Sequence, residues 1–166
     1  MTRHFLVGVW RLIRSEIQTS TGKQFFPLGE DCDGLMILTE QGLISAQLMR
    51  VSRSNFAGKD MRTGTPEELR EAFEGYVALW GVYEIDTERH QLTYEIQGSL
   101  FPNWVGQTNL RYYELKDDLL TLRTPPFPFA GDSSVAELTW KRVTAGGQGD
   151  VQVRSGSTAD GASEHG

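Results

Sequence analysis

The side chains of this sequence best suited to chemistry are an arginine, three tyrosines and the polar residues of one apolar loop. Tyr83, Tyr94 and Tyr113 lie on alternating stretches typical of strands, and Arg111 lies two residues before Tyr113. A guanidinium can bind a carbonyl, an enolate or a carboxylate, and a phenol can donate a hydrogen bond or a proton. We therefore predict a small-molecule pocket with Arg111 and Tyr94 as catalytic candidates. The ligand-binding candidates are Tyr83, Tyr113, Asn103, Trp104 and Gln47.

Arg111 also has a purely structural interpretation, in which it and the tyrosines form a satisfied polar cluster that braces the fold. A buried guanidinium without partners is very unfavourable, so it needs phenol or carbonyl oxygens, an amide or an anionic ligand. Asn103 and Trp104 belong to the loop GSLFPNWVG, residues 98–106, which is too apolar for an ordinary surface loop. Such a loop favours the lip of a cavity.

Other chemistries have little support in the sequence. The three histidines are scattered over a terminus, a turn and the tail, and the lone cysteine, Cys32, permits no internal disulfide. No glycine-rich loop stands before a helix in the way that phosphate binding requires. The net charge is −6 and no long basic run exists. We therefore expect neither a metal, a cofactor nor a nucleic-acid partner.

The elements that must position these residues are short alternating strands joined by hairpin-length turns. Their number and spacing predict an all-β fold, an antiparallel barrel of about eight strands closed around one small hydrophobic ligand. The predicted strands are Leu6–Ile17, Gly34–Thr39, Leu43–Arg50, Tyr76–Ile85, Gln91–Gln97, Thr108–Leu115, Leu119–Thr124 and Val135–Val143.

The turns also predict which side chains face inward. Pairing Ile85 with Leu92 sets Tyr83 opposite Tyr94 on an apolar face, which we take as the interior. The opposite face carries charged residues and is expected to be solvated.

The next hairpin pairs Leu115 with Leu120, which sets Tyr113 opposite Leu122 and Arg111 opposite Thr124. Arg111 thereby shares the apolar face, inside the barrel or at its mouth. The hairpin within residues 34–50 stays ambiguous by one residue, so that either Gln47 or Leu48 faces in.

One helix is predicted over residues 66–74, with Thr65 as its N-cap and Glu68 at the capping-box spacing. Leu69 and Phe73 lie four residues apart and form an apolar stripe, which we expect to lie on the barrel or close one end.

The domain organisation is simple. Residues 1–143 are expected to form the barrel, and residues 144–166, rich in Gly, Ser, Asp and Gln, to form a disordered tail. The first residues lack the apolar region of a signal peptide, and no apolar run approaches the ~20 residues that span a bilayer. We expect a soluble, cytoplasmic protein with no membrane partner.

Ordered pieces of the sequence resemble the lipocalin-like domain family of bacteria and fungi, over about residues 5–143. The pieces are residues 6–12 (LVGVWRL), 27–30 (PLGE), 42–50 (GLISAQLMR), 64–67 (GTPE), 81–86 (GVYEID), 98–106 (GSLFPNWVG), 111–115 (RYYEL) and 138–143 (LTWKRV). The resemblance implies that Trp10 plugs the barrel base and that Arg142 packs over it. Many relatives carry a histidine where this chain has Tyr94, so histidine-based acid–base chemistry does not carry over.

Three functions are consistent with such a barrel. The first is a binding protein that carries a small hydrophobic molecule. The second is a cofactor-free isomerase, cyclase or dehydratase of natural-product metabolism, in which Arg111 stabilises an oxyanion and Tyr94 acts as the acid. The third is a structural or interaction module, since one fold hosts many activities.

Overall fold

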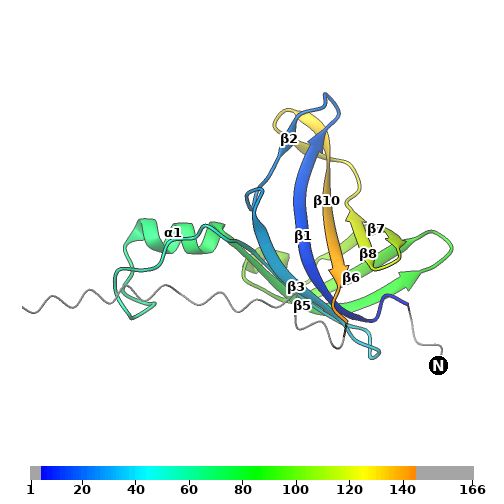
Figure 1. Cartoon of the computed structure of the whole chain (residues 1–166), viewed down its shortest axis with the longest axis horizontal. Helices are drawn as coiled ribbons and strands as arrows, with labels where there is room; N and C mark the ends of the chain where they lie inside the picture. Colours follow the sequence, from blue (N-terminus) through cyan, green and yellow to red (C-terminus); the bar gives the residue numbers. More distant parts are fainter. Residues whose placement is uncertain (1–4, 145–166) are drawn as a thin grey trace, which may run out of the picture.

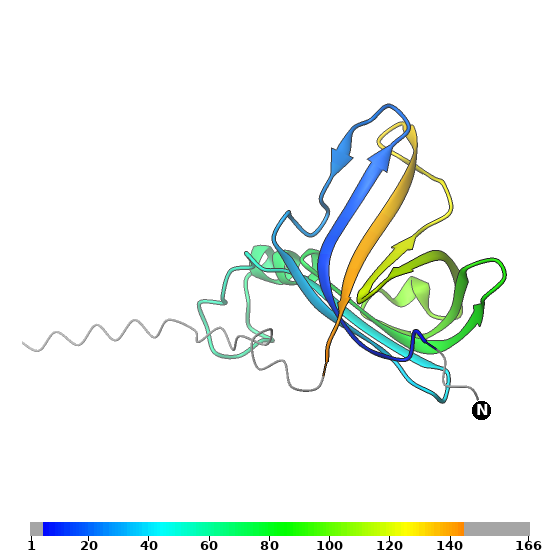
Figure 2. The same cartoon turned by 45° about the vertical axis from the view of Figure 1, so that its right-hand side comes forward.

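Eight antiparallel strands close into a barrel in the computed structural model, which describes residues 5–144 (Figure 1 and Figure 2). The predicted all-β, eight-stranded barrel is therefore confirmed. In ring order, the strands are β1 (Gly8–Thr19), β3 (Cys32–Leu38), β4 (Leu43–Arg50), β5 (Tyr76–Asp86), β6 (Gln91–Ser99), β7 (Thr108–Lys116), β8 (Leu119–Arg123) and β10 (Asp132–Arg142). Short strands extend the sheet beside β1 and β10, namely β2 (Gln24–Phe25) and β9 (Phe127–Phe129).

The ring closes because β1 pairs with β10 along most of its length. Trp10 faces Arg142 at one end of this ladder, and Thr19 faces Ser134 at the other. The register shifts between Leu12 and Arg14, an irregularity of the kind that bends a strand. Each barrel strand therefore has two neighbours, and closure removes the exposed edges that an open sheet would present.

The predicted registers of the two hairpins are confirmed for their tyrosines, whereas the predicted pair of Arg111 with Thr124 does not form. Tyr83 pairs with Tyr94 in the β5–β6 ladder. Tyr113 pairs with Leu122 in the β7–β8 ladder, which ends at Tyr112 and Arg123. Arg111 lies beyond that end and pairs with Leu92 of β6 on its other side.

The ambiguous hairpin of β3 and β4 has Leu48 facing in. Ile44, Ala46 and Leu48 are all buried and alternate along one face of β4, as the two-residue period of a strand requires. Gln47 falls on the opposite face, where its Nε2 donates to Ser45 Oγ over 2.8 Å. Gln47 therefore lies on the outside of the barrel.

The base of the barrel is sealed by the pair that the family resemblance implied. The Trp10 ring is fully buried, and its Nε1 donates to the Leu6 carbonyl over 3.0 Å. The Arg142 guanidinium lies 4.1 Å from the centre of that ring and donates to the Val7 carbonyl over 2.9 Å and to the Phe5 carbonyl. This pair confirms the prediction and joins the first barrel strand to the last.

The helix α1 (Pro66–Glu74) begins as predicted. Thr65 Oγ1 accepts a hydrogen bond from Glu68 N over 3.2 Å, and the Glu68 carboxylate accepts one from Thr65 N over 2.8 Å. A single 3-10 turn, η1 (Pro102–Trp104), adds to the helical content of the described residues.

The apolar stripe of α1 is only partly covered: Phe73 lies beside Val77 and Trp104 at the barrel rim, whereas Leu69 does not, so the predicted packing holds only at the C-terminal end of the helix. Leu69 and Phe73 are 44% and 46% exposed, and Figure 1 shows α1 standing to the side of the barrel. The rest of the helix is held by its polar residues. The carboxylates of Glu68 and Glu71 accept hydrogen bonds from the loop before the helix, and only the C-terminal end of α1 approaches the barrel rim.

The predicted disordered tail, apart from Thr144, lies outside the described residues. Within residues 5–144, no helix is long and apolar enough to cross a membrane. The same residues contain no group of three or more His, Cys, Asp or Glu side chains that could hold a metal ion.

Candidate functional site

A cavity of about 360 Å³ lies inside the barrel, and all eight barrel strands contribute to its lining. This volume falls within the range of roughly 300–1,000 Å³ usual for small-molecule sites. Most of the wall is apolar, and its side chains come from the inward faces of the strands: Met36, Ile44, Ala46, Leu48, Leu79, Leu122 and Leu138.

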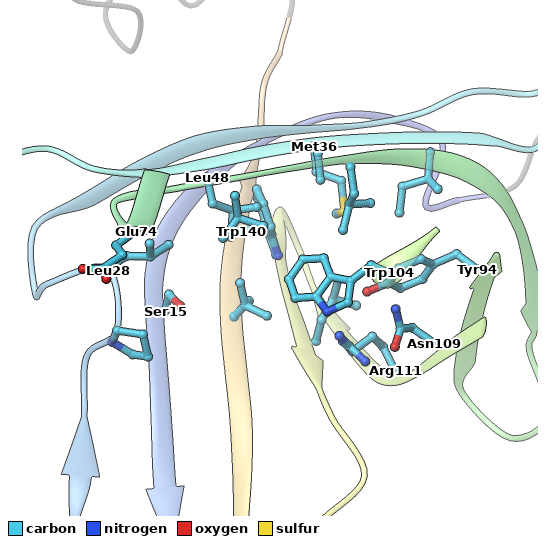
Figure 3. A pocket seen from close by; sticks show the side chains of 17 residues that line it. Ser15, Leu28, Met36, Leu48, Glu74, Tyr94, Trp104, Asn109, Arg111 and Trp140 are labelled. Carbon is cyan, nitrogen blue, oxygen red and sulfur yellow. The ribbon is translucent and has the colours of Figure 1, made fainter. Parts of the chain in front are cut away.

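The cavity has a mouth and a polar end. Glu74 and Pro27 line it and are exposed, which places an opening to solvent at the C-terminal end of α1. Figure 3 shows Glu74, Leu28 and Ser15 together on one side of the cavity. On the other side, the same view shows a polar and aromatic group that consists of Tyr94, Trp104, Asn109 and Arg111.

Strand pairing assembles this polar group. Tyr94 of β6 is directly opposite Asn109 of β7, so both side chains lie on the same face of the sheet. Arg111 follows two residues later on β7 and therefore points to the same side. The sequence prediction missed Asn109, although its two-residue spacing from Arg111 was a sufficient signal.

Arg111 carries a positive charge into a largely apolar space. Its Nη1 donates to the Leu110 carbonyl over 2.8 Å, and its Cζ lies 5.5 Å from the centre of the Tyr94 ring. Within residues 5–144, no ion pair joins Arg111 to an acidic side chain. A guanidinium has five N–H donors, so several remain available to an acceptor in the cavity.

Tyr94 is a neutral phenol at physiological pH. Burial raises the pKa of its hydroxyl, and the nearby charge of Arg111 opposes this shift only in part. The side chain is 7% exposed, so its hydroxyl is held within the protein interior. Tyr94 is therefore suited to hydrogen bonding or to donating a proton, and unsuited to acting as a base.

The loop before β7 positions Trp104 at the cavity. The 3-10 turn folds the loop back, and the Trp104 ring packs edge-on against Phe101 with 5.7 Å between ring centres. The neighbouring Asn103 is exposed, and its carbonyl accepts a hydrogen bond from Gln107 Nε2 over 2.9 Å. The loop thus directs its indole inward and its amide side chain to solvent.

The structure brings three of the seven predicted residues to the cavity, namely Tyr94, Trp104 and Arg111. The Tyr83 hydroxyl donates to the Thr39 carbonyl over 2.7 Å, at the β3–β4 turn. Tyr113 is buried against Phe5 and His90. These two tyrosines, with Asn103 and Gln47, do not line the cavity.

Trp140 is a further cavity residue that the pattern alone did not single out. It lies on β10 between Leu12 of β1 and Leu120 of β8, so its position depends on ring closure. The indole is 2% exposed. Its only signal in the sequence was membership of the motif at residues 138–143 that carries the family resemblance.

Comparison with known proteins agrees with this architecture. The profile of the lipocalin-like domain matches residues 7–143, which contain every barrel strand and every residue of the cavity wall. Among curated proteins, the 4'-hydroxy-3'-methoxypropiophenone carrier protein ppsC of Aspergillus oryzae is 31% identical over 107 residues. These residues cover 60% of this chain and 96% of that protein. No solved structure matches the chain significantly. Because the profile covers most of the sequence, the chain belongs to the lipocalin-like domain family.

Proposed function

We propose that this protein binds and carries a small, mostly apolar molecule that bears oxygen acceptors. The observation that carries the proposal is Arg111: its guanidinium faces an apolar cavity and, within residues 5–144, has no acidic partner. Ligand pockets commonly combine apolar walls with a few placed polar groups. Asn109 and Tyr94 add an amide and a phenol beside Arg111, so a carbonyl, phenol or ether oxygen would find donors there.

The name of the relative supports the same ligand class. 4'-Hydroxy-3'-methoxypropiophenone is an aryl ketone that also carries a phenol and a methyl ether. Its ring suits the leucine and methionine wall, and its oxygens suit the group around Arg111. We therefore take aryl ketones of this kind as the first ligands to test.

Isothermal titration of the full chain with this aryl ketone tests the proposal. We expect Arg111→Leu to weaken binding by roughly 10- to 100-fold, because a hydrogen bond to a charged group contributes about 1.5–3 kcal/mol. Arg89→Leu removes the same charge from an exposed turn and is the matched control. Equal affinities in wild type and Arg111→Leu would reject Arg111 as the anchor, and failure of oxygenated aromatic compounds to bind at all would reject the carrier proposal.

A second candidate is a cofactor-independent isomerase, cyclase or dehydratase that acts on the same kind of molecule. The neutral phenol of Tyr94 beside the Arg111 guanidinium favours it, because the phenol can donate a proton to the substrate while the guanidinium stabilises negative charge that develops on a substrate oxygen. Mass spectrometry of the ligand after incubation separates the two candidates. An unchanged compound indicates carriage, and an isomer or a dehydrated product that Tyr94→Phe no longer forms indicates catalysis.

A further inference from the structure

The indole of Trp140 has a buried N–H group without a hydrogen-bond partner. Its Nε1 is one of two such buried side-chain atoms within residues 5–144; the other, Arg53 Nε, does not belong to the cavity lining. Buried donors are normally paired, and leaving one unsatisfied costs about 1–3 kcal/mol. The unsatisfied Trp140 donor therefore requires an explanation.

Trp10 shows what the same fold does with an indole that is purely structural. Trp10 and Trp140 are both almost completely buried. The Trp10 Nε1 donates to the Leu6 carbonyl over 3.0 Å. The two indoles also differ in position: Trp140 lines the cavity, and Trp10 does not.

The protein around Trp140 offers little that could accept its proton. Its cross-strand neighbours are Leu12 and Leu120. Leu138, two positions before it, lies between Leu122 of β8 and Ser15 of β1, so the Ser15 hydroxyl is one polar group on this part of the wall. A buried water needs two to four polar partners, and Ser15 is the single polar side chain among these cross-strand neighbours. An acceptor carried by an apolar molecule suits this place better than water does.

Figure 3 shows the Trp140 indole inside the cavity, between the mouth residues Glu74 and Leu28 and the polar group that contains Arg111. A molecule that reaches from the mouth to Arg111 would pass the Trp140 indole. The Nε1 atom itself has almost no accessible surface, so an oxygen at that point of the molecule would satisfy it after a small shift of the indole.

We infer that Trp140 is a second hydrogen-bonding residue of the ligand site, separate from Arg111, Asn109 and Tyr94. The inference rests on the proposed function and narrows it. The preferred ligand has an apolar, aromatic frame with two separated oxygen acceptors, one for the Arg111 group and one for Trp140 Nε1. Hydrocarbons of the same size, and molecules with oxygens at one end alone, should bind more weakly.

Nuclear magnetic resonance of the ¹⁵N-labelled full chain gives a direct test, because each indole N–H of the four tryptophans gives its own signal. Trp140→Phe assigns the Trp140 signal by its loss. On addition of the aryl ketone probe, we expect the Trp140 proton signal to move downfield, as hydrogen bonding requires. The Trp10 signal, whose donor is already bound to Leu6, should stay in place.

A binding cycle supplies the second readout. The probe is compared with its deoxy analogue, in which the ketone oxygen is replaced by two hydrogens, in wild type and in Trp140→Phe. We expect Trp140→Phe to weaken binding of the probe by about tenfold, the loss of one buried hydrogen bond, and to leave unchanged the binding of an analogue that lacks the oxygen facing Trp140. A companion compound without the phenol and ether oxygens identifies which end of the probe meets Trp140. Trp80→Phe, on the exposed outer face, is the matched control.

The outcomes distinguish this inference from the proposed function. If the probe binds and Arg111→Leu weakens it, but the Trp140 signal is unmoved and Trp140→Phe binds every compound as wild type does, the second anchor is rejected and the carrier proposal stands. A Trp140 signal that shows a hydrogen bond before any ligand is added means that another partner already binds the N–H, and also rejects the second anchor. If no oxygenated aromatic compound binds, both proposals fall together.

Discussion

Replacing Arg111 by leucine should leave the barrel nearly as stable as before, whereas Arg142→Leu should destabilise it strongly. Both arginines lie beside an aromatic ring, with Cζ 5.5 Å from the Tyr94 ring centre and 4.1 Å from the Trp10 ring centre. Their hydrogen bonds differ. Arg142 donates to the carbonyls of Val7 and Phe5, which belong to the segment that seals the base. Arg111 donates to Leu110, its own neighbour in sequence.

The expected losses of unfolding free energy follow from those contacts. Removing Arg142 breaks two charge-assisted hydrogen bonds and a close cation–π contact, for a loss of about 3–5 kcal/mol. Removing Arg111 breaks one local bond and a more distant ring contact. It also relieves the partial burial of an unpaired charge and adds an apolar side chain to the wall. We expect these effects to cancel to within about 1 kcal/mol.

Urea unfolding measures both variants, with the midpoint compared at unchanged slope. The result also separates the two interpretations of Arg111. A brace within a satisfied polar network would cost about 3–5 kcal/mol when broken, whereas a ligand anchor would not. If Arg111→Leu loses as much stability as Arg142→Leu, Arg111 is a structural brace and the anchor interpretation is refuted.

Three other substitutions test separate parts of the structure. Ala46→Phe places a ring in the cavity from β4, so ligand affinity should fall more than about tenfold while the melting temperature stays within about 5 °C, as calorimetry can show. Thr65→Ala removes a cap worth about 1 kcal/mol, so amide exchange in α1 should accelerate roughly fivefold; the global unfolding midpoint should not move, because α1 buries no residue. Burial acts to raise the pKa of Glu16, but hydrogen bonds from Arg14 and two glutamines outweigh it and hold the pKa below its ordinary value. The Glu16 carboxylate therefore stabilises the fold above its ordinary pKa of 4.5, and that contribution is lost as the pH falls through the lowered pKa. In urea unfolding at a series of pH values, Glu16→Gln should reduce this loss of stability at acid pH. If the loss is unchanged in Glu16→Gln, it belongs to other groups.

The face on which each strand residue lies was predictable because turns set the pairing and strands alternate with a period of two. The position of each inward-facing side chain along the barrel axis was not predictable in the same way. Tyr113 shares a face with Arg111, yet two residues of strand separate them by about 7 Å, and its ring packs against Phe5 and His90. Tyr83 similarly meets the Thr39 carbonyl at a turn.

The residues that the sequence did not single out depend on long-range pairing or on tertiary packing. Trp140 enters the cavity because β10 inserts between β1 and β8, and no local pattern specifies those partners. For α1, the capping residues Thr65 and Glu68 are local signals and were predicted correctly. The packing of Leu69 and Phe73 is a tertiary property, and a four-residue spacing does not specify it.

The seam between β1 and β10 also determines when the cavity is first complete during synthesis. The ribosome makes β1 early, but the strand that gives it its second neighbour, together with Trp140, emerges after all the other barrel strands. Contacts that span so much of the chain form slowly, and until they form, the nascent sheet has open edges prone to aggregation. Ser15 of β1 and Trp140 of β10 both line the cavity, so a small molecule bound there would stabilise the closed ring relative to the open sheet.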